Sequence, residues 1–242
     1  MKLTIIAQCC VDEETRNRNT ALSAKWPEPK GEGHLAVVGG GPSIRHHIDT
    51  LRKWPGEIWA INGAYWWCKE NGITATYFTV DPEAYLGEII AGAHRAVLAS
   101  HCDPSAFTVP DISCAKGDYP GPTSATAASL IAIKAGFTEV TWFGCESCYE
   151  DTTHAYENQP VPELLRIACN GGEYLVKPDL VLQAQVLSKV IRTAPHVFHE
   201  ESGGLLRAMI EGGPEFDALA GTQLIHDTMR EQEPHTETTR RD

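Results

Sequence analysis

The stretch His34-Leu35-Ala36-Val37-Val38-Gly39-Gly40-Gly41-Pro42-Ser43 decides the fold of this chain. An apolar run that ends in glycines, then a proline and a serine, predicts a buried parallel strand, a tight turn and a helix start. Glycine allows the close approach of a ligand, and unpaired N–H groups with the helix dipole would converge on one spot that suits a phosphate. A glycine-rich turn without a ligand is the alternative, because the spacing is neither GxGxxG nor a P-loop.

Further strand and helix patterns alternate along the chain. Apolar runs predict strands at residues 1–10, 57–62, 75–80, 95–100, 139–146, 172–177 and 196–200. Amphipathic or capped stretches predict helices at residues 44–54, 64–67, 122–135 and 178–192, after residue 82 and from residue 205. This alternation predicts an α/β fold, a Rossmann-like doubly wound, mostly parallel sheet with helices on both faces.

The remaining segments set the domain organisation. We expect one Rossmann-like domain over residues 1–230, including a polar excursion or short helix at residues 11–33. Residues 102–121 contain several prolines and no clear period, so they predict a long loop that crosses toward the site. Residues beyond 213 could add one more helix, whereas residues 231–242 are charged, lack apolar periodicity and are expected to be a disordered tail.

The composition is that of a globular protein with an acidic balance. The 242 residues are 42% hydrophobic and 21% charged, and the formal net charge is -12. This charge argues against nucleic acid or an anionic membrane as the main partner, and it favours small ligands, including phosphorylated ones. No apolar run has the length of a membrane span and none resembles a signal sequence, so we expect a cytoplasmic protein.

The eight cysteines are scattered, and several lie inside apolar runs. Reduced thiols are therefore expected. The tightest pair, Cys145 and Cys148, has CxxC spacing, but no second pair at zinc spacing accompanies it. The pattern disfavours a metal or redox role for this pair.

Polar residues follow several predicted strands, at the edge where open α/β sheets bind ligands. Asn62 could contact a ligand there, or it could be a turn asparagine before Gly63. Asp81 could bind a ribose or a metal, or cap the helix that follows. Thr123 and Ser124 could hold a phosphate or a ribose at a helix start, or serve only as N-caps.

The loop after the strand at residues 139–146 concentrates groups that handle protons. Tyr149, His154 and Tyr156 can donate to a leaving phosphate or move a proton near neutral pH. A polar surface loop is the alternative interpretation.

Six motifs occur together in this chain: Val38-Gly39-Gly40-Gly41-Pro42-Ser43, Ala60-Ile61-Asn62-Gly63, Val80-Asp81-Pro82, Pro122-Thr123-Ser124, Phe143-Gly144-Cys145-Glu146 and Thr153-His154-Ala155. In order and approximate spacing they resemble the family that contains the archaeal-type 6-hydroxymethylpterin diphosphokinase and the motility accessory factors, also described as domain of unknown function 115. They are also similar to the related sialyltransferases of glycosyltransferase family 42. The resemblance covers roughly residues 35–211, and the joint occurrence is far more specific than any one motif.

The resemblance implies roles for individual residues. In the sialyltransferases the glycine-proline-serine turn and the strand-end asparagine hold the nucleotide and phosphate of a CMP-sugar without a metal. Tyr149 and Tyr156 would assist the leaving group, and His154 would be the base, unless His196 or His199 takes that role. The donor site would comprise Gly39, Gly40, Gly41, Pro42, Ser43, Asn62, Gly63, Asp81, Thr123, Ser124, Gly144 and Glu146.

Two positions depart from the family pattern. The families usually place an aspartate two residues after the strand glycine, where this chain has Glu146. The sialyltransferase turn also carries an asparagine where this chain has only glycine. Both changes concern the donor site and leave the expected fold intact.

We therefore expect a transferase that uses a nucleotide-activated donor. The first hypothesis is a glycosyltransferase of CMP-sugar type, which needs no metal or other cofactor. The second is a diphosphokinase that moves pyrophosphate from ATP to a pterin-like alcohol, with Mg²⁺ on Asp81 and Glu146. The third is a non-catalytic nucleotide-binding module. The expected partners are a nucleotide or nucleotide-sugar donor and an unidentified acceptor, with no nucleic acid and no membrane span, and the chain could form a homo-oligomer.

Overall fold

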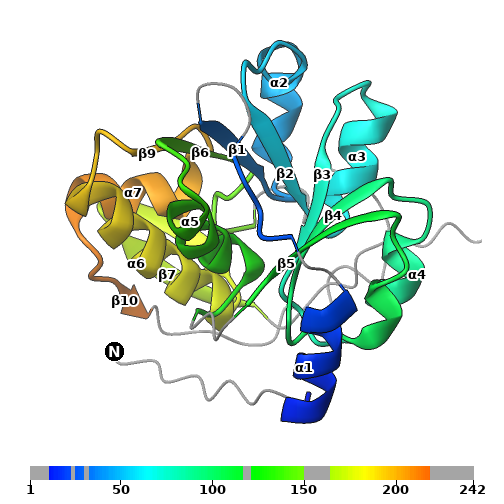
Figure 1. Cartoon of the computed structure of the whole chain (residues 1–242). Helices are drawn as coiled ribbons and strands as arrows, with labels where there is room; N and C mark the ends of the chain where they lie inside the picture. Colours follow the sequence, from blue (N-terminus) through cyan, green and yellow to red (C-terminus); the bar gives the residue numbers. More distant parts are fainter. Residues whose placement is uncertain (1–10, 23–24, 30–32, 117–120, 150–163, 219–242) are drawn as a thin grey trace, which may run out of the picture.

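A seven-stranded parallel sheet forms the centre of the computed structural model, which describes residues 11–22, 25–29, 33–116, 121–149 and 164–218. The strand order is β5-β4-β3-β2-β1-β6-β9, and every pairing in this sheet is parallel. The predicted α/β, Rossmann-like fold is confirmed (Figure 1). The strands are β1 (His34–Val38), β2 (Glu57–Ile61), β3 (Thr76–Thr79), β4 (Arg95–Ala99), β5 (Asp111–Ala115), β6 (Glu139–Phe143) and β9 (Phe198–Glu200).

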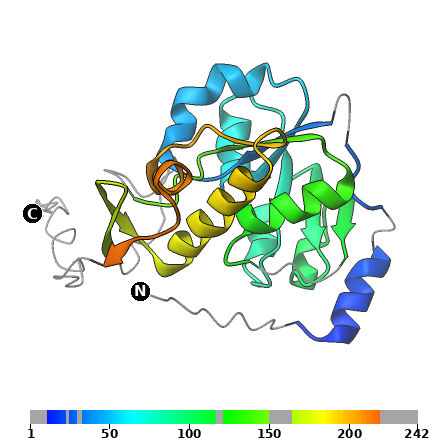
Figure 2. The same cartoon turned by 90° about the vertical axis from the view of Figure 1, so that its left-hand side faces the viewer.

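Helices cover both faces of the sheet, as expected for a doubly wound fold. α2 and α3 lie on one face, and α5 and α6 lie on the other (Figure 2). α3 packs against β2 and β3, whereas α5 packs against β1 and β3. The helical elements are α1 (Glu13–Leu22), η1 (Pro42–His47), α2 (Ile48–Arg52), α3 (Ala64–Glu70), α4 (Leu86–Ile90), η2 (Pro104–Ala106), α5 (Ser124–Ala135), α6 (Pro178–Thr193) and α7 (Gly204–Gly212).

Large aromatic side chains fill the core on the central strands. Trp59 and Trp142 are buried, Trp59 stacks on Phe78 with ring centroids 5.1 Å apart, and Trp142 lies against Phe198. Such side chains bury large apolar areas, and parallel strands covered on both faces have near-continuous apolar sequences. This packing fixes the positions of the strand ends that form the site.

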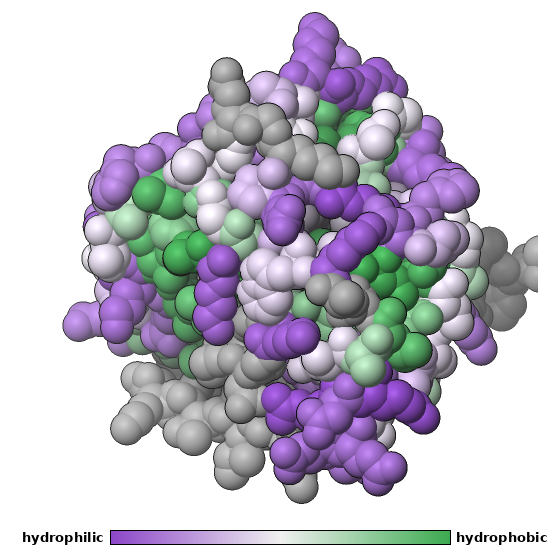
Figure 3. Space-filling view, in the orientation of Figure 1, coloured by the Kyte–Doolittle hydropathy of each residue, from purple (hydrophilic) through white to green (hydrophobic). Residues whose placement is uncertain are grey.

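Residues 11–33, predicted as a polar excursion or short helix, contain helix α1. Hydrophilic side chains gather over this helix, at the lower right of Figure 3. Its one buried residue, Asn19, donates from Nδ2 to the carbonyl oxygens of Ser100 at 3.0 Å and Cys102 at 2.8 Å. These two bonds fasten a polar helix to the segment that follows β4.

Three segments differ from the sequence-based expectation. Residues 102–121 were expected to be a loop, but they contain η2 and the edge strand β5, in which Asp111 and Ser113 interrupt the apolar run. The helix after the glycine turn begins as the 3-10 element η1 before it becomes α2. Residues 217–218 form a strand, in the segment beyond residue 213 that could have added one more helix.

A second, antiparallel sheet was also not predicted. The strand expected at residues 172–177 is present as β8, but it pairs with β7 through a two-residue turn and does not join the main sheet. Asn170 and Gly171 of that turn have φ values of 47° and 77°. Asn-Gly is the strongest short signal for a hairpin, so this sheet was readable from the sequence. Its strands are β7 (Leu165–Cys169), β8 (Gly172–Val176) and β10 (Asp217–Ala218).

Two expectations concern segments outside the described residues: the strand at residues 1–10 and the tail at residues 231–242. Among the described helices, none combines the length and apolar character that crossing a membrane requires.

Candidate functional site

The carboxyl ends of β1 and β6 mark the point at which the strand order reverses, because β2 continues the sheet on one side of β1 and β6 on the other. In open α/β sheets, ligands bind in the crevice outside such a switch point. A cleft of about 460 Å³ lies there. The predicted residues that line it are Gly39, Gly40, Gly41, Asn62, Asp81, Thr123, Ser124, Gly144, Glu146 and Tyr149.

Three residues predicted for the donor site do not line this cleft: Pro42, Ser43 and Gly63. Pro42 is the first residue of η1, as its fixed φ favours, and Gly63 precedes α3. A larger hollow of about 640 Å³ lies beside β7 and β10, and it contains none of the predicted residues. The cleft at the switch point is therefore the candidate site.

Two of the turn glycines let the ends of β1 and β6 approach each other. The Gly39 N–H donates to the Phe143 carbonyl and the Gly41 N–H to the Gly144 carbonyl, both at 2.8 Å. A Cβ added at Gly39 would lie 2.4 Å from the Gly144 carbonyl oxygen, well inside van der Waals contact. The glycines were expected to let a ligand approach closely. They serve, at least at Gly39, to let the backbone after β6 approach the backbone after β1.

A carboxylate of the chain occupies part of the spot predicted for a phosphate. The Ser43 N–H donates to Oε1 of Glu146 at 2.5 Å, and Glu146 is only 2% exposed. A Cβ added at Gly41 would lie 1.6 Å from Glu146 Oε2. Glycine at position 41 therefore makes room for the Glu146 side chain.

Asp81 is held by two of the other predicted residues. Asn62 Nδ2 donates to Asp81 Oδ2 at 2.7 Å, and Ser124 Oγ donates to Asp81 Oδ1 at 3.3 Å. Asp81 does not cap α4, whose N-cap is Tyr85. Asn62 has a φ of 49°, the left-handed geometry of a turn asparagine. Asn62 also lines the cleft, as a ligand contact would.

We expect Asn62→Gly to lower the free energy of unfolding by about 1 kcal/mol, because it removes one hydrogen bond to a carboxylate but keeps the left-handed backbone accessible. Asn62→Ala should cost roughly 1 kcal/mol more, since alanine disfavours positive φ. Urea denaturation of both variants measures the two contributions. Equal stability of the two variants would contradict the strained backbone that the φ of Asn62 indicates.

Thr123 is the N-cap of α5, as one of its two interpretations predicted, and it also contacts α6. Its Oγ1 accepts from the Thr126 N–H as the N-cap of α5, and it donates to Oε1 of Gln183 at 2.6 Å. Gln183 Nε2 in turn donates to Ser147 Oγ at 2.9 Å, and Gln183 is 6% exposed. This chain of bonds ties α5, α6 and the segment after β6 together around the cleft.

Several lining residues were not predicted, among them Glu83 and Tyr85 after β3 and Lys177, Asp179 and Gln183 at the start of α6. Lys177 is the N-cap of α6, and its Nζ lies 3.6 Å from Asp179 Oδ2. The sequence placed α6 correctly, but its packing beside the cleft depends on the chain's return from the second sheet. No local sequence signal reveals that arrangement.

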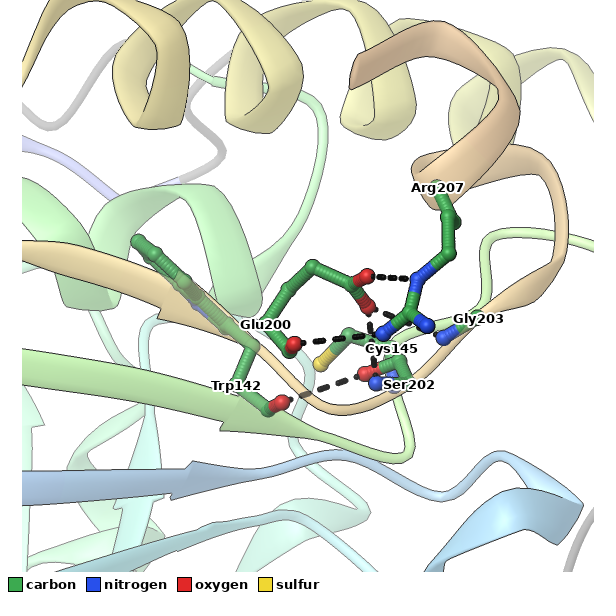
Figure 4. A network of polar contacts seen from close by, with 6 residues as sticks. All are labelled: Trp142, Cys145, Glu200, Ser202, Gly203 and Arg207. Carbon is green, nitrogen blue, oxygen red and sulfur yellow. Dashed lines mark hydrogen bonds and ion pairs between the residues drawn. The ribbon is translucent and has the colours of Figure 1, made fainter. Parts of the chain in front are cut away.

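A polar network behind the cleft fixes the backbone that presents Glu146 (Figure 4). The Cys145 N–H donates to Ser202 Oγ at 2.9 Å, and the Ser202 N–H donates to Glu200 Oε2 at 2.8 Å. Glu200 Oε1 also accepts from Arg207 Nε. The Leu206 N–H, near the start of α7, donates to the Glu146 carbonyl at 3.0 Å.

The predicted catalytic residues are only partly described. Tyr149 is 7% exposed and lines the cleft, and its N–H donates to the Leu175 carbonyl at 2.7 Å. His154 and Tyr156 lie outside the described residues. Of the other candidate bases, His196 is exposed, His199 lies 4.0 Å from Glu139 in β6, and neither lines the cleft.

Cys145 and Cys148 are buried, and neither is in a disulfide. Burial, and secondarily the charge of Glu146, raises the pKa of Cys145 well above its usual range. A thiol that stays protonated is a poor nucleophile and a poor metal ligand.

Among the described lining residues, four carboxylates (Asp81, Glu83, Glu146 and Asp179) face one ammonium group, that of Lys177. Within the described ranges, no three His, Cys, Asp or Glu side chains are grouped so that they could hold a metal ion. Mg²⁺ is usually held by one or two carboxylates together with substrate phosphates. Asp81 and Glu146, the two predicted ligands, both line the cleft.

Comparison of the chain with protein-family models, with curated proteins and with solved structures gives no match.

Proposed function

We propose that this chain is a transferase whose cleft binds a nucleotide-activated donor, and that it transfers a sugar from a donor of the CMP-sugar type without a metal. One observation carries the proposal. Segments that are far apart in the sequence, at the ends of β1, β2, β3 and β6 and at the start of α5, line one cleft at the switch point. Doubly wound sheets bind nucleotides at this position. The resemblance to glycosyltransferase family 42 supplies the reaction class.

The proposed chemistry uses hydrogen-bond donors at the leaving phosphate. As the sugar departs, negative charge develops on the nucleotide phosphate, and preorganised donors and cations lower that barrier. Tyr149 brings a phenol group to the cleft, whereas the hydroxyl groups of Thr123 and Ser124, which also line it, donate to Gln183 and Asp81. Tyr149 and Tyr156 would stabilise the leaving phosphate and His154 would accept the proton of the acceptor hydroxyl. These last roles rest on the resemblance.

A diphosphokinase is the second candidate, and the carboxylate-rich lining favours it. Four carboxylates around one lysine repel a nucleotide di- or triphosphate unless a divalent cation compensates the charge. Asp81 and Glu146 would hold Mg²⁺ together with the phosphates of ATP, and the ion would neutralise charge on the transferred group.

The test is calorimetric titration of the whole protein with CMP, CDP, UDP, GDP, AMP and ATP, each with and without Mg²⁺. We expect a pyrimidine nucleotide to bind without metal, since the proposed donor is a CMP-sugar. Binding of ATP only with Mg²⁺ would favour the diphosphokinase. If a nucleotide binds but the protein neither hydrolyses nor transfers a group from any CMP-sugar or ATP, the chain is a non-catalytic nucleotide-binding module. If none of the nucleotides binds, the proposed nucleotide site is wrong.

The proposal includes the surroundings in which the protein works. None of the described cysteines is in a disulfide, and all are buried, which is typical of a reducing compartment and supports a cytoplasmic location. These cysteines are Cys68, Cys102, Cys114, Cys145, Cys148 and Cys169. The proposed partners are the nucleotide-sugar donor and an acceptor molecule whose hydroxyl group receives the sugar. A homo-oligomer is compatible with this proposal.

A further inference from the structure

The donor that we propose carries a negatively charged phosphate, so the cleft has to supply donors or positive charge for it. The glycine turn supplies few. The N–H groups of Gly39 and Gly41 donate to carbonyls, and the N–H of Ser43 donates to the Glu146 carboxylate. A phosphate placed on this turn would lie against the Glu146 carboxylate, and two like charges in a partly enclosed cleft repel each other.

A second wall, at the end of β3, also presents a carboxylate. Asn62 Nδ2 and Ser124 Oγ are the donors there, and both donate to Asp81. A phosphate bonded to these groups would lie against the Asp81 carboxylate, and the two like charges would repel each other. This wall therefore suits the neutral hydroxyl groups of a ribose better than a phosphate.

The third wall, at the start of α6, carries the positive charge. Lys177 is the cationic residue among the described residues of the cleft lining, and its side chain is 34% exposed. Its Nζ lies 3.6 Å from Asp179 Oδ2, and the side chain of Asp179 is 37% exposed. A partly exposed ion pair of this kind is weak, so a ligand phosphate can take the place of the Asp179 carboxylate.

The position of this wall is fixed by Gln183. Gln183 lies one turn after Asp179 on the same side of α6, and its bonds to Thr123 and Ser147 hold the helix against the cleft. We propose that Lys177 is the residue that binds the donor phosphate, so that the phosphate lies at the start of α6 and not on the glycine turn. This inference rests on the proposed function.

The test compares the phosphate contribution to binding in matched variants of the whole protein. The probes are CMP and AMP, each with its nucleoside, cytidine or adenosine, titrated calorimetrically at two NaCl concentrations. For Lys177→Met we expect about tenfold weaker binding of the nucleotide, unchanged binding of the nucleoside and a weaker dependence on salt. Lys177→Arg should stay within about threefold of the parent protein, because it keeps the charge.

Two further variants sharpen the test. Lys189→Met removes the same charge from the exposed side of α6 and should leave nucleotide binding unchanged. Asp179→Asn removes the competing carboxylate, so we expect it to strengthen nucleotide binding by about threefold. Circular dichroism checks that each variant is folded.

The outcomes separate the inference from the proposed function. If the parent protein binds a nucleotide and Lys177→Met binds it equally well, the assignment of Lys177 is wrong while the nucleotide site stands. Equal losses for nucleotide and nucleoside in Lys177→Met would also overturn it, since they would indicate a general disturbance of the cleft. If the parent protein binds neither nucleotide, the proposed function fails, and the assignment fails with it.

Discussion

Replacing Gly144 with alanine is expected to lower the free energy of unfolding by about 2–4 kcal/mol, the sum of backbone strain and overpacking. Gly144 has a φ of +64°, which side chains other than glycine rarely adopt. The added Cβ would lie 2.1 Å from Cγ2 of Ile44 and 2.7 Å from the Gly39 carbonyl oxygen. Ile44 is completely buried, so it has no room to move away. Urea denaturation measures the loss.

The hairpin glycine Gly171 provides the matched control. Its φ is +77°, and an added Cβ would meet no atom within 4 Å beyond its chain neighbours. Gly171→Ala should therefore show the backbone strain alone, roughly 1–2 kcal/mol. A loss at Gly144 no greater than the loss at Gly171 would show that the ends of β1 and β6 adjust freely, contrary to the tight packing described above.

The fold was largely predictable, because its strands are buried on both faces and their sequences show it. The run that becomes β1 and the repeated strand-helix units placed β1 to β4 and β6 in one parallel sheet. The edge strand β5 was missed because Asp111 and Ser113 interrupt its apolar pattern. The hairpin of β7 and β8 was missed although Asn170-Gly171 signals it.

The site was predictable where it depends on strand ends and was not where it depends on packing. Parallel strands end at one edge, so Asn62, Asp81 and Glu146 were expected to lie together, and the cleft contains all three. Lys177 and Gln183 reach the same cleft from α6, whose position follows from tertiary contacts. The hydrogen bond from the Ser43 N–H to the Glu146 carboxylate was also not predictable, because the two residues are 103 positions apart and no local pattern links them.

Glu146→Gln is expected to strengthen the binding of CMP by about tenfold at low salt. The substitution removes a negative charge from the cleft wall, and at the effective dielectric of a partly buried site that charge acts on a phosphate over several ångströms. Glutamine has nearly the same volume, and its Oε1 can still accept from the Ser43 N–H, so the turn should keep its geometry. Calorimetric titration with CMP measures the change, and higher salt should reduce it.

Glu70→Gln is the control, because Glu70 lies exposed at the end of α3 and does not line the cleft. It should leave CMP binding unchanged.

The same Glu146→Gln variant separates the two candidate reactions, because they require opposite contributions from this carboxylate. In a metal-independent glycosyltransferase Glu146 opposes the donor phosphate, and its neutralisation helps binding. In a diphosphokinase it would hold Mg²⁺, so its neutralisation would instead weaken Mg²⁺-dependent binding of ATP. Weaker binding of CMP without metal would contradict both roles and would indicate that Glu146 acts by shaping the glycine turn.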